Sequence, residues 1–435
     1  MKYSFKKKIN FFLILFLTFN LDSLFCKSFK NQFRSLGDDD EIITITEDDG
    51  DLLEYAIEEL NKSGGTIYID TPIINMKNTT ELIISGKLPG GIIGIRQENG
   101  EYPIIKFRKS NQFELFGGIT ITGSNKIIEY MIIENSVSYG ITIMGDNNIF
   151  DHIISRYNHA SGFLIYGDFN SFNYCYSYRN CDMGIYYINA DGFDILGEKN
   201  NVFNYCFAWD NSNSGFSYDR ILNSSDLSYL HSGSWNNGNI NVFTGRFDYD
   251  NGAPLDKNLW TIQEMIESDP NFVTNYYNKK YNINEDKIQN MSVSSWVAKV
   301  SPVLDGNGFT FGNRNSSQSI DVKRNSLYNA AFDHKSGGFV DNYNHKYNAY
   351  VTDCVSFNND INYRLSYTFS KWSNNWSWNS KKKDQLNGGV TTKNPSNANS
   401  AQRSFYTVRD QIIRAVSANI FPDGVNFDRV ISSLK

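Results

Sequence analysis

The chain of 435 residues has few prolines (8), few cysteines (5) and only 20% charged residues. No two cysteines form a CxxC pair, which excludes the usual zinc and thioredoxin motifs. The histidines form no HxxxH or HExxH spacing, so the sequence shows no histidine-based metal motif. We expect each of them at a turn or on the surface; they are His152, His159, His231, His334 and His345.

Long apolar runs are missing except at the beginning of the chain. Residues 1–26 combine a lysine-rich start with an apolar run over residues 11–19, which is typical of a secretory signal. No other segment is long enough to span a membrane, so we expect a secreted protein without a membrane partner. Removal of residues 1–26 takes away four lysines and one aspartate and changes the net charge from −6 to about −9. This acidic balance argues against a nucleic-acid partner, and we expect a monomer.

Asparagine, glycine and aromatic residues are abundant instead. The chain has 55 Asn, 32 Gly, 27 Tyr and 31 Phe. Asn and Gly favour tight turns, and aromatic residues favour strands. The composition therefore predicts an all-β protein with many short strands.

An internal repeat gives these strands an architecture. Four segments share a turn that begins with Asn and ends with Gly: 135–140, 158–162, 180–184 and 211–215. Their glycines are 22, 22 and 31 residues apart. A coil of about 22 residues with two or three short strands is typical of a parallel β-helix, in which each coil buries its apolar side against its neighbours.

Equivalent positions of successive coils are expected to stack. The turn asparagines then form a hydrogen-bonded ladder, for which we expect Asn135, Asn158, Asn180, Asn211 and Asn358. Cys175, Cys206 and Cys354 occupy one slot of the repeat, and we expect them to be stacked core residues. A disulfide between neighbouring coils is the alternative.

The repeat also predicts the organisation of the chain. Residues 27–48 form a polar leader to which we assign no structure, and residues 49–61 have the spacing of an amphipathic helix that caps the first coil. The β-helix domain is predicted over 49–380, with a partly helical insertion at about 244–302. Residues 381–435 are expected to be a loop and a C-terminal capping segment. Trp372, Trp376 and Trp378 are expected to pack on the last coils, with stacking on sugars as the alternative.

Several motifs resemble those of polysaccharide lyase family 9. They occur in the family's order over about residues 50–380: Asn189-Ala-Asp-Gly-Phe193, Asn201-Val-Phe-Asn-Tyr-Cys-Phe-Ala-Trp209, Asn211-Ser-Asn-Ser-Gly-Phe-Ser217, Gly306-Asn-Gly-Phe-Thr-Phe-Gly312, Ala331-Phe-Asp-His-Lys-Ser-Gly-Gly-Phe339 and Asn358-Asn-Asp-Ile-Asn-Tyr363. The resemblance implies a right-handed parallel β-helix of the pectin-lyase type that acts outside the cell. It also implies Ca²⁺-dependent β-elimination of polygalacturonate, in which Ca²⁺ holds the uronate carboxylate and an unprotonated lysine removes the C5 proton.

The resemblance places the calcium ligands at four positions that are aspartates in the family. Asp191 matches the first, whereas Asn213, Ser214 and Ser217 occupy the other three. Asp219 lies two residues from Ser217 and points to the same side of a strand, so it is a substitute ligand. Asp182, Asp194 and Asp210 are further acids near these motifs, and solvated turn acids are the alternative reading.

The residue at the position of the family's catalytic base also differs from the family. Thr310 stands where the family has its catalytic lysine. A threonine hydroxyl does not act as a base near neutral pH without help. Arg314, Lys323 and Arg324 follow in the sequence, and Lys323 is the candidate that loses its proton most easily.

Three functions remain open from the sequence. The chain is a lyase with a rebuilt calcium and base site, or it binds uronate chains without cleaving them, or it is another β-helix enzyme such as a hydrolase or epimerase. The expected partner in the first two cases is polygalacturonate or a related acidic polysaccharide. Unsaturated products, binding without products, and reducing ends without unsaturation distinguish the three.

Overall fold

The structure is a computed structural model that describes residues 42–107, 117–181, 190–196, 200–218, 227–238, 306–311, 323–341, 348–365, 375–386 and 392–393. Within these ranges it consists of one α-helix and short strands that pair in parallel. None of the described helical residues form a segment that is long and apolar enough to cross a membrane. The predicted signal at 1–26 and the predicted insertion at 244–302 lie outside the described residues, and the described part of the predicted leader begins at residue 42.

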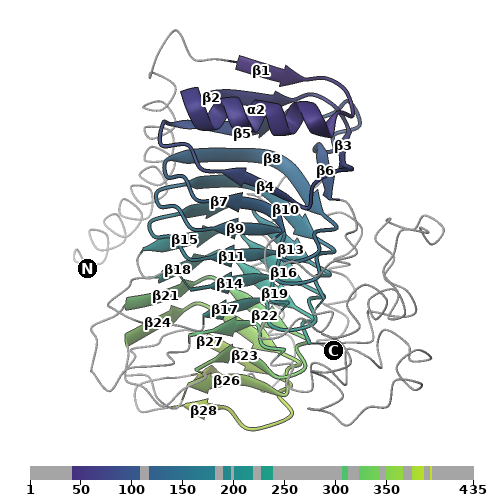
Figure 1. Cartoon of the computed structure of the whole chain (residues 1–435). Coiled ribbons are helices and arrows are strands. Elements are labelled where there is room, and N and C mark those ends of the chain that lie inside the picture. Colours follow the sequence, from purple (N-terminus) through teal and green to yellow (C-terminus); the bar gives the residue numbers. More distant parts are fainter. Residues whose placement is uncertain are drawn as a thin grey trace, which may run out of the picture.

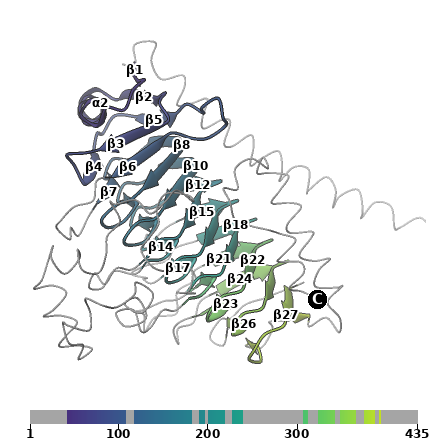
Figure 2. The same cartoon turned by 90° about the vertical axis from the view of Figure 1, so that its right-hand side faces the viewer.

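The strands stack into a parallel β-helix with three faces (Figures 1 and 2). Each coil passes through face 2, then face 3, then face 1. Face 1 is a ten-stranded sheet of β4 (Glu81–Ile84), β7 (Gly118–Ile121), β9 (Ile141–Ile143), β11 (Phe163–Ile165), β14 (Phe193–Ile195), β17 (Phe216–Tyr218), β20 (Phe309–Thr310), β23 (Gly337–Val340), β26 (Ile361–Leu365) and β28 (Gln385–Leu386).

Faces 2 and 3 together form a second, bent sheet. Face 2 contains β1 (Ile42–Ile45), β2 (Gly65–Ile69), β5 (Gly90–Gly94), the first halves of β8 (Lys126–Glu134) and β10 (Ile149–Arg156), β12 (Ser171–Asn173), β15 (Asn201–Asn204), β18 (Leu227–Leu230), β21 (Lys323–Leu327) and β24 (Asn348–Thr352). Face 3 contains β3 (Ile73–Met76), β6 (Ile104–Phe107), the second halves of β8 and β10, β13 (Tyr176–Tyr178), β16 (Phe207–Trp209), β19 (Gly233–Trp235), β22 (Ala330–Phe332), β25 (Val355–Phe357), β27 (Asn375–Trp378) and β29 (Thr392–Lys393).

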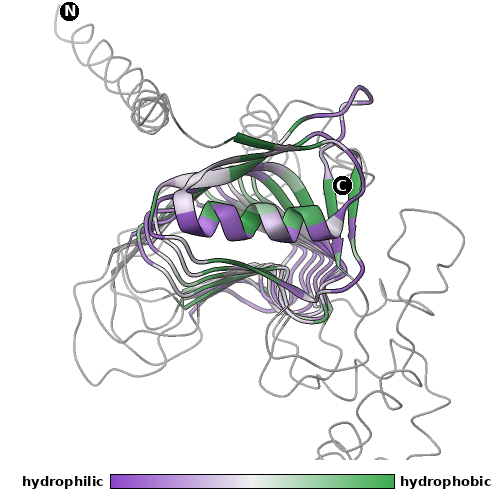
Figure 3. Ribbon diagram, turned by 45° about the horizontal axis from the view of Figure 1, so that its top comes forward, coloured by the Kyte–Doolittle hydropathy of each residue, from purple (hydrophilic) through white to green (hydrophobic). Residues whose placement is uncertain are grey.

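Helix α2 (Gly50–Ser63) closes the first end of the coil stack, as the sequence predicts. Asp49 is its N-cap and accepts a hydrogen bond from the Leu52 N–H at 2.9 Å. Gly64, with φ +77°, ends the helix. The helix lies across the end of the coils (Figure 3), and its buried side chains join the core; they are Leu53, Ala56, Ile57 and Leu60.

The core between the faces is built from columns of like side chains. On face 1 the rings stack from coil to coil with centroids 4.6–5.2 Å apart; they are Phe163, Phe193, Phe216, Phe309, Phe339 and Tyr363. Cys175, Cys206 and Cys354 are buried in one slot between faces 2 and 3, so their prediction as core residues is confirmed. The cysteines of the described residues are free thiols, so the disulfide alternative is wrong.

The corner between faces 2 and 3 is turned by single residues with positive φ. Most of them carry rings that stack along the outside of the corner with centroids 4.7–5.1 Å apart; they are Tyr130, His152, Tyr174, Tyr205, His231 and Tyr328. The ring faces contact one another, which fixes the corner of each coil. His152 and His231 are therefore half-buried members of this column.

The asparagine ladder exists, but its register differs from the prediction. The side-chain amide of Asn158 donates to Asn180, that of Asn180 to Asn211, and that of Asn211 to Asn237, at 2.9–3.0 Å. Asn135 and Asn358 lie one residue earlier in their coils, at the corner that follows face 3, where φ is also positive, so their assignment to the ladder is wrong. Asn359 is in the ladder in place of Asn358.

The coils extend beyond the predicted limits at both ends. β1 lies in the leader to which the sequence assigns no structure, and it pairs with β2. β28 and β29 lie in the predicted C-terminal loop and continue faces 1 and 3. Trp376 and Trp378 are on β27, half-buried and paired with β25, in agreement with packing on the last coils. Trp372, His345 and residues 394–435 lie outside the described residues.

Candidate functional site on the outer side of face 1

The positions of the family motifs lie together on face 1, at and just before the beginnings of its strands. Asp191 lies just before β14, and Asn213 and Ser214 lie just before β17. Ser217 is on β17, and Thr310 ends β20. These strands are neighbours in face 1, so the structure brings the five residues onto three successive coils.

Asp191 is a rung of a hydrogen-bond ladder along the beginnings of these strands. Its N–H donates to Ser161 Oγ at 3.0 Å, and its Oδ1 accepts the Ser214 N–H at 2.7 Å. Ser214 Oγ then accepts the Asn307 N–H at 3.3 Å, and Asn307 Oδ1 accepts the Gly337 N–H at 2.9 Å. Each coil therefore contributes one side-chain oxygen that binds the backbone of the next coil. In this arrangement the Asp191 carboxylate stabilises the stacking of the coils.

Thr310 has a similar structural role. Its Oγ1 accepts the backbone N–H of Tyr218 at 2.8 Å, and its side chain is fully buried. Tyr218 is the last residue of β17, where the backbone pairing with β20 is limited to Phe216 and Phe309. The hydroxyl thus provides a hydrogen-bond acceptor for the Tyr218 N–H beside the short strand β20.

An outward-facing row runs along face 1 past Thr310. Alternation of side chains places its members opposite the ring column of the core. In order along the axis they are Thr120, Thr142, Leu164, Asp194, Ser217, Thr310, Val340 and Arg364. Asp194 pairs with Ser217 and is the acid nearest to the motif positions in this row. Asp219 and Asp182 lie outside the described residues.

Two other candidates lie elsewhere. Asp210 is at the corner after face 3, where Asn236 donates to it at 2.6 Å and Arg179 approaches it at 3.6 Å. Burial raises the pKa of the Asp210 carboxyl, and these two partners oppose the increase. Lys323 begins β21 on face 2, whereas Thr310 is on face 1, so the two residues are on different sides of their coils. Arg314 lies outside the described residues, and Arg324 follows Lys323 on β21.

The residues at the calcium positions provide a poor ligand set. Ca²⁺ takes about six to eight oxygen ligands, preferably from several carboxylates. Of Asp191, Asn213, Ser214 and Ser217, one is a carboxylate, and its Oδ1 binds a backbone N–H. The described residues contain no group of three or more His, Cys, Asp or Glu side chains with the geometry for a metal. These four residues therefore do not fit a calcium ion, and the prediction for Asp219 stays a prediction.

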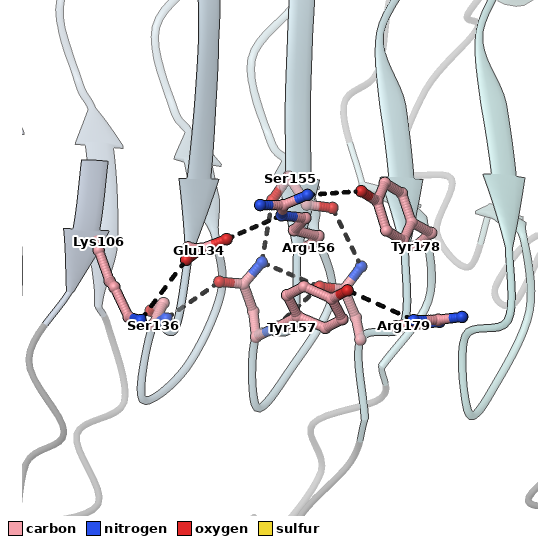
Figure 4. A network of polar contacts seen from close by, with 10 residues as sticks. Lys106, Glu134, Ser136, Ser155, Arg156, Tyr157, Tyr178 and Arg179 are labelled. Atoms are coloured by element: carbon pink, nitrogen blue, oxygen red, sulfur yellow. Dashed lines mark hydrogen bonds and ion pairs between the residues drawn. The ribbon is translucent and has the colours of Figure 1, made fainter. Parts of the chain in front are cut away.

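A second polar cluster lies on face 3 (Figure 4). Glu134 Oε2 binds Arg156 Nε at 2.8 Å, and Arg156 Nη1 donates to the Tyr178 hydroxyl at 2.9 Å. Lys106 Nζ lies 4.0 Å from Glu134 Oε1. Both side chains of the Glu134–Arg156 pair are almost completely buried, at 3% and 5% exposed. This cluster joins four neighbouring strands, β6, β8, β10 and β13, and is part of the scaffold.

His334 is a buried residue that the sequence places at a turn or on the surface, and this expectation is wrong. The ring takes the place of an asparagine in the ladder, between Asn237 and Asn359. Its Nδ1 accepts the Asn237 N–H at 3.3 Å, and its Nε2 lies 3.0 Å from the Ser234 carbonyl. Burial lowers the pKa of the ring to about 3, with a smaller opposing effect of the Ser234 carbonyl, so the ring is neutral. His159 is buried as well.

The three-faced coil and its motifs define a β-helix of the pectate-lyase type. Residues 38–253 match the family model described as "Pel9A-like, right handed beta helix region". This region is therefore a pectate-lyase-like right-handed β-helix.

Similar solved structures are distant in sequence. A structure described as a rhamnogalacturonan lyase is 16% identical, with a TM-score of 0.50 over 82% of this chain and 87% of that chain. The crystal structure of pectate lyase Pel9A is 20% identical, with a TM-score of 0.49 over 79% of this chain and 73% of that chain. A comparison with curated proteins finds no match.

Proposed function

We propose that the chain is a secreted protein that binds uronate-containing polysaccharide along the outer side of face 1 and does not cleave it by calcium-dependent β-elimination. The shared fold with a rhamnogalacturonan lyase supports a polysaccharide as the ligand. The motif resemblance supports polygalacturonate, or a polymer that contains galacturonate, as the first polymer to test.

The observation that carries this proposal is the state of Thr310. Abstraction of the C5 proton needs a base that reaches the sugar in an unprotonated form. Thr310 has no such group, and its buried hydroxyl binds the Tyr218 N–H. The position that supplies the base in the resembling family is therefore used for packing here.

The residues that would bind the cation for this reaction are also depleted. A metal ion would stabilise the negative charge that develops on the uronate when the proton leaves. The Asp191 carboxylate, which is the remaining family ligand, holds Ser214 instead. Both requirements of the elimination are lost at positions where the scaffold keeps its hydrogen bonds.

The outer side of face 1 has features that suit binding. Arg364 on β26 is the only cation of the outer row among the described residues. Parallel strands lie about 4.8 Å apart, so the row from β11 to β26 extends about 24 Å. A polysaccharide that lies along the axis therefore contacts several coils, and a uronate carboxylate near β26 is attracted to Arg364.

The test measures binding and products together. Polygalacturonate and rhamnogalacturonan are each titrated into the folded protein by calorimetry, with Ca²⁺ and with a chelator. The same mixtures are then followed by ultraviolet absorbance for unsaturated ends and by a reducing-end assay, across neutral to alkaline pH. We expect binding to at least one polymer, and no product of either kind, in both calcium conditions.

Each of the other outcomes contradicts a different part of the proposal. Calcium-dependent unsaturated product shows a lyase with a rebuilt site, which directs attention to Asp219. Reducing ends without unsaturation show a hydrolase. Absence of binding to both polymers from a folded protein removes the proposal of polysaccharide recognition.

A further inference from the structure

A second outward row lies beside the first, at the exit of the face 1 strands. Its members are Thr122, Met144, Tyr166 and Leu196, each two residues beyond a member of the first row. The backbone N–H groups of Met144, Tyr166 and Leu196 still donate to the neighbouring coil, at 2.7–2.8 Å. The alternation of the strand therefore continues, and these side chains are on the outer side.

The apolar residues Met144 and Tyr166 of this row are exposed, whereas most side chains of the first row are buried. Met144 is 39% exposed and Tyr166 is 42% exposed, and Phe169 in the following turn is 47% exposed. Single exposed apolar residues are ordinary, but three within two successive coils form a patch. Leu164, two residues before Tyr166, packs with Tyr139, Ala160 and Leu196 and supports the patch from the first row.

The patch is continuous with the candidate site. Leu196 follows β14, and the next strand of face 1 is β17, which carries Ser217. A polymer that runs along the axis from Ser217 meets Leu196 on the coil of Asp194 and Tyr166 on the coil beyond it. The apolar C–H side of a pyranose ring packs on an exposed aromatic side chain, while its hydroxyls bind nearby acceptors.

The charges at this end disfavour a uronate. Among the described members of the two rows on β7, β9, β11 and β14, Asp194 is the only charged side chain. The adjacent turns add Asp146 and Asp168, where the Asp168 N–H donates to Asp146 Oδ1. A sugar carboxylate at this place meets carboxylates of like sign, whereas a neutral sugar carries no charge that they repel.

We propose that Tyr166, with Met144, forms a subsite for a neutral pyranose, so that the bound polymer places a neutral sugar on this patch and a uronate nearer to Arg364. This inference rests on the proposed polysaccharide binding and adds the class of sugar and its position. It selects rhamnogalacturonan, which alternates a neutral sugar with a uronate, over polygalacturonate, which has uronate only.

The test compares variants and polymers by calorimetry. Tyr166→Ala is expected to weaken the affinity for rhamnogalacturonan by about tenfold. Tyr166→Phe keeps the ring and is expected to bind within about twofold of the wild type. Tyr55→Ala, at a tyrosine that is 56% exposed on the capping helix α2, is the matched control and is expected to change nothing. Thermal unfolding of each variant confirms that it folds.

The outcomes separate this inference from the proposed function. Rhamnogalacturonan binding that Tyr166→Ala leaves unchanged overturns the subsite and leaves polysaccharide binding in place. Binding of polygalacturonate in clear preference to rhamnogalacturonan contradicts the assignment of a neutral sugar to this subsite. Failure of the wild type to bind either polymer removes the proposed function, and the subsite with it.

Discussion

Replacing Glu134 by alanine is expected to destabilise the protein by about 3–5 kcal/mol. Glu134 and Arg156 are both buried and bind each other at 2.8 Å. The variant removes this carboxylate while the guanidinium stays in a site with little water, where an uncompensated charge is costly. Equilibrium unfolding by urea measures the change as a lower midpoint.

A double variant separates the cost of an unpaired charge from the contribution of the pair. Glu134→Met with Arg156→Leu removes both charges and keeps similar volumes. It is expected to lie within about 2 kcal/mol of the wild type, since apolar replacement of a whole buried pair is often neutral or stabilising. A double variant as unstable as Glu134→Ala contradicts this account of the cluster.

Acidification is expected to destabilise the protein through His334. The folded-state pKa of the ring is lowered to about 3, whereas an unfolded histidine has a pKa of 6.5. Between these values the unfolded chain binds a proton that the folded protein does not bind. The stabilisation is therefore fully present above pH 6.5 and is lost as the pH falls towards 3, at about 1.4 kcal/mol per pH unit from this group.

Carboxylates also contribute to acid unfolding, so the His334→Asn variant is the control. Asparagine is the usual residue of this ladder and does not titrate. Urea unfolding of both proteins at several pH values from 7 to 4.5 gives the two slopes. The slope of the variant is expected to be smaller by about 1.4 kcal/mol per unit below pH 6. Equal slopes would show that His334 does not carry the linkage.

The sequence predicts the β-helix because equivalent residues recur at a regular spacing along the chain. The 22-residue spacing, the helix over 49–61 and the common slot of Cys175, Cys206 and Cys354 all agree with the structure. These features depend on the repeat length and on apolar spacing, both of which can be read locally.

The register of the ladder could not be read in this way. The corner and the rung are adjacent residues, and both accept asparagine, as Asn358 and Asn359 show. The corner requires positive φ, which asparagine tolerates, and the rung requires a side-chain amide. His334 was missed because its role becomes visible only when its coil is aligned with those of Asn237 and Asn359.

The roles of Asp191 and Thr310 also depend on distant coils. Asp191 binds a residue 23 positions later, and Thr310 binds one 92 positions earlier. The motifs predict which positions meet on face 1, but the hydrogen bonds that occupy them come from the stacking. Lys323 shows the same difficulty, since a residue near Thr310 in sequence lies on another face of the coil.

The central claim is that Asp191 is a structural rung and no longer a calcium ligand. Thermal unfolding of the wild type and of Asp191→Asn, each with millimolar Ca²⁺ and with a chelator, tests it directly. Asparagine retains an oxygen for the Ser214 N–H, so we expect similar melting temperatures for both proteins and no effect of calcium on either. A calcium-dependent rise in the wild type that disappears in Asp191→Asn would contradict the claim.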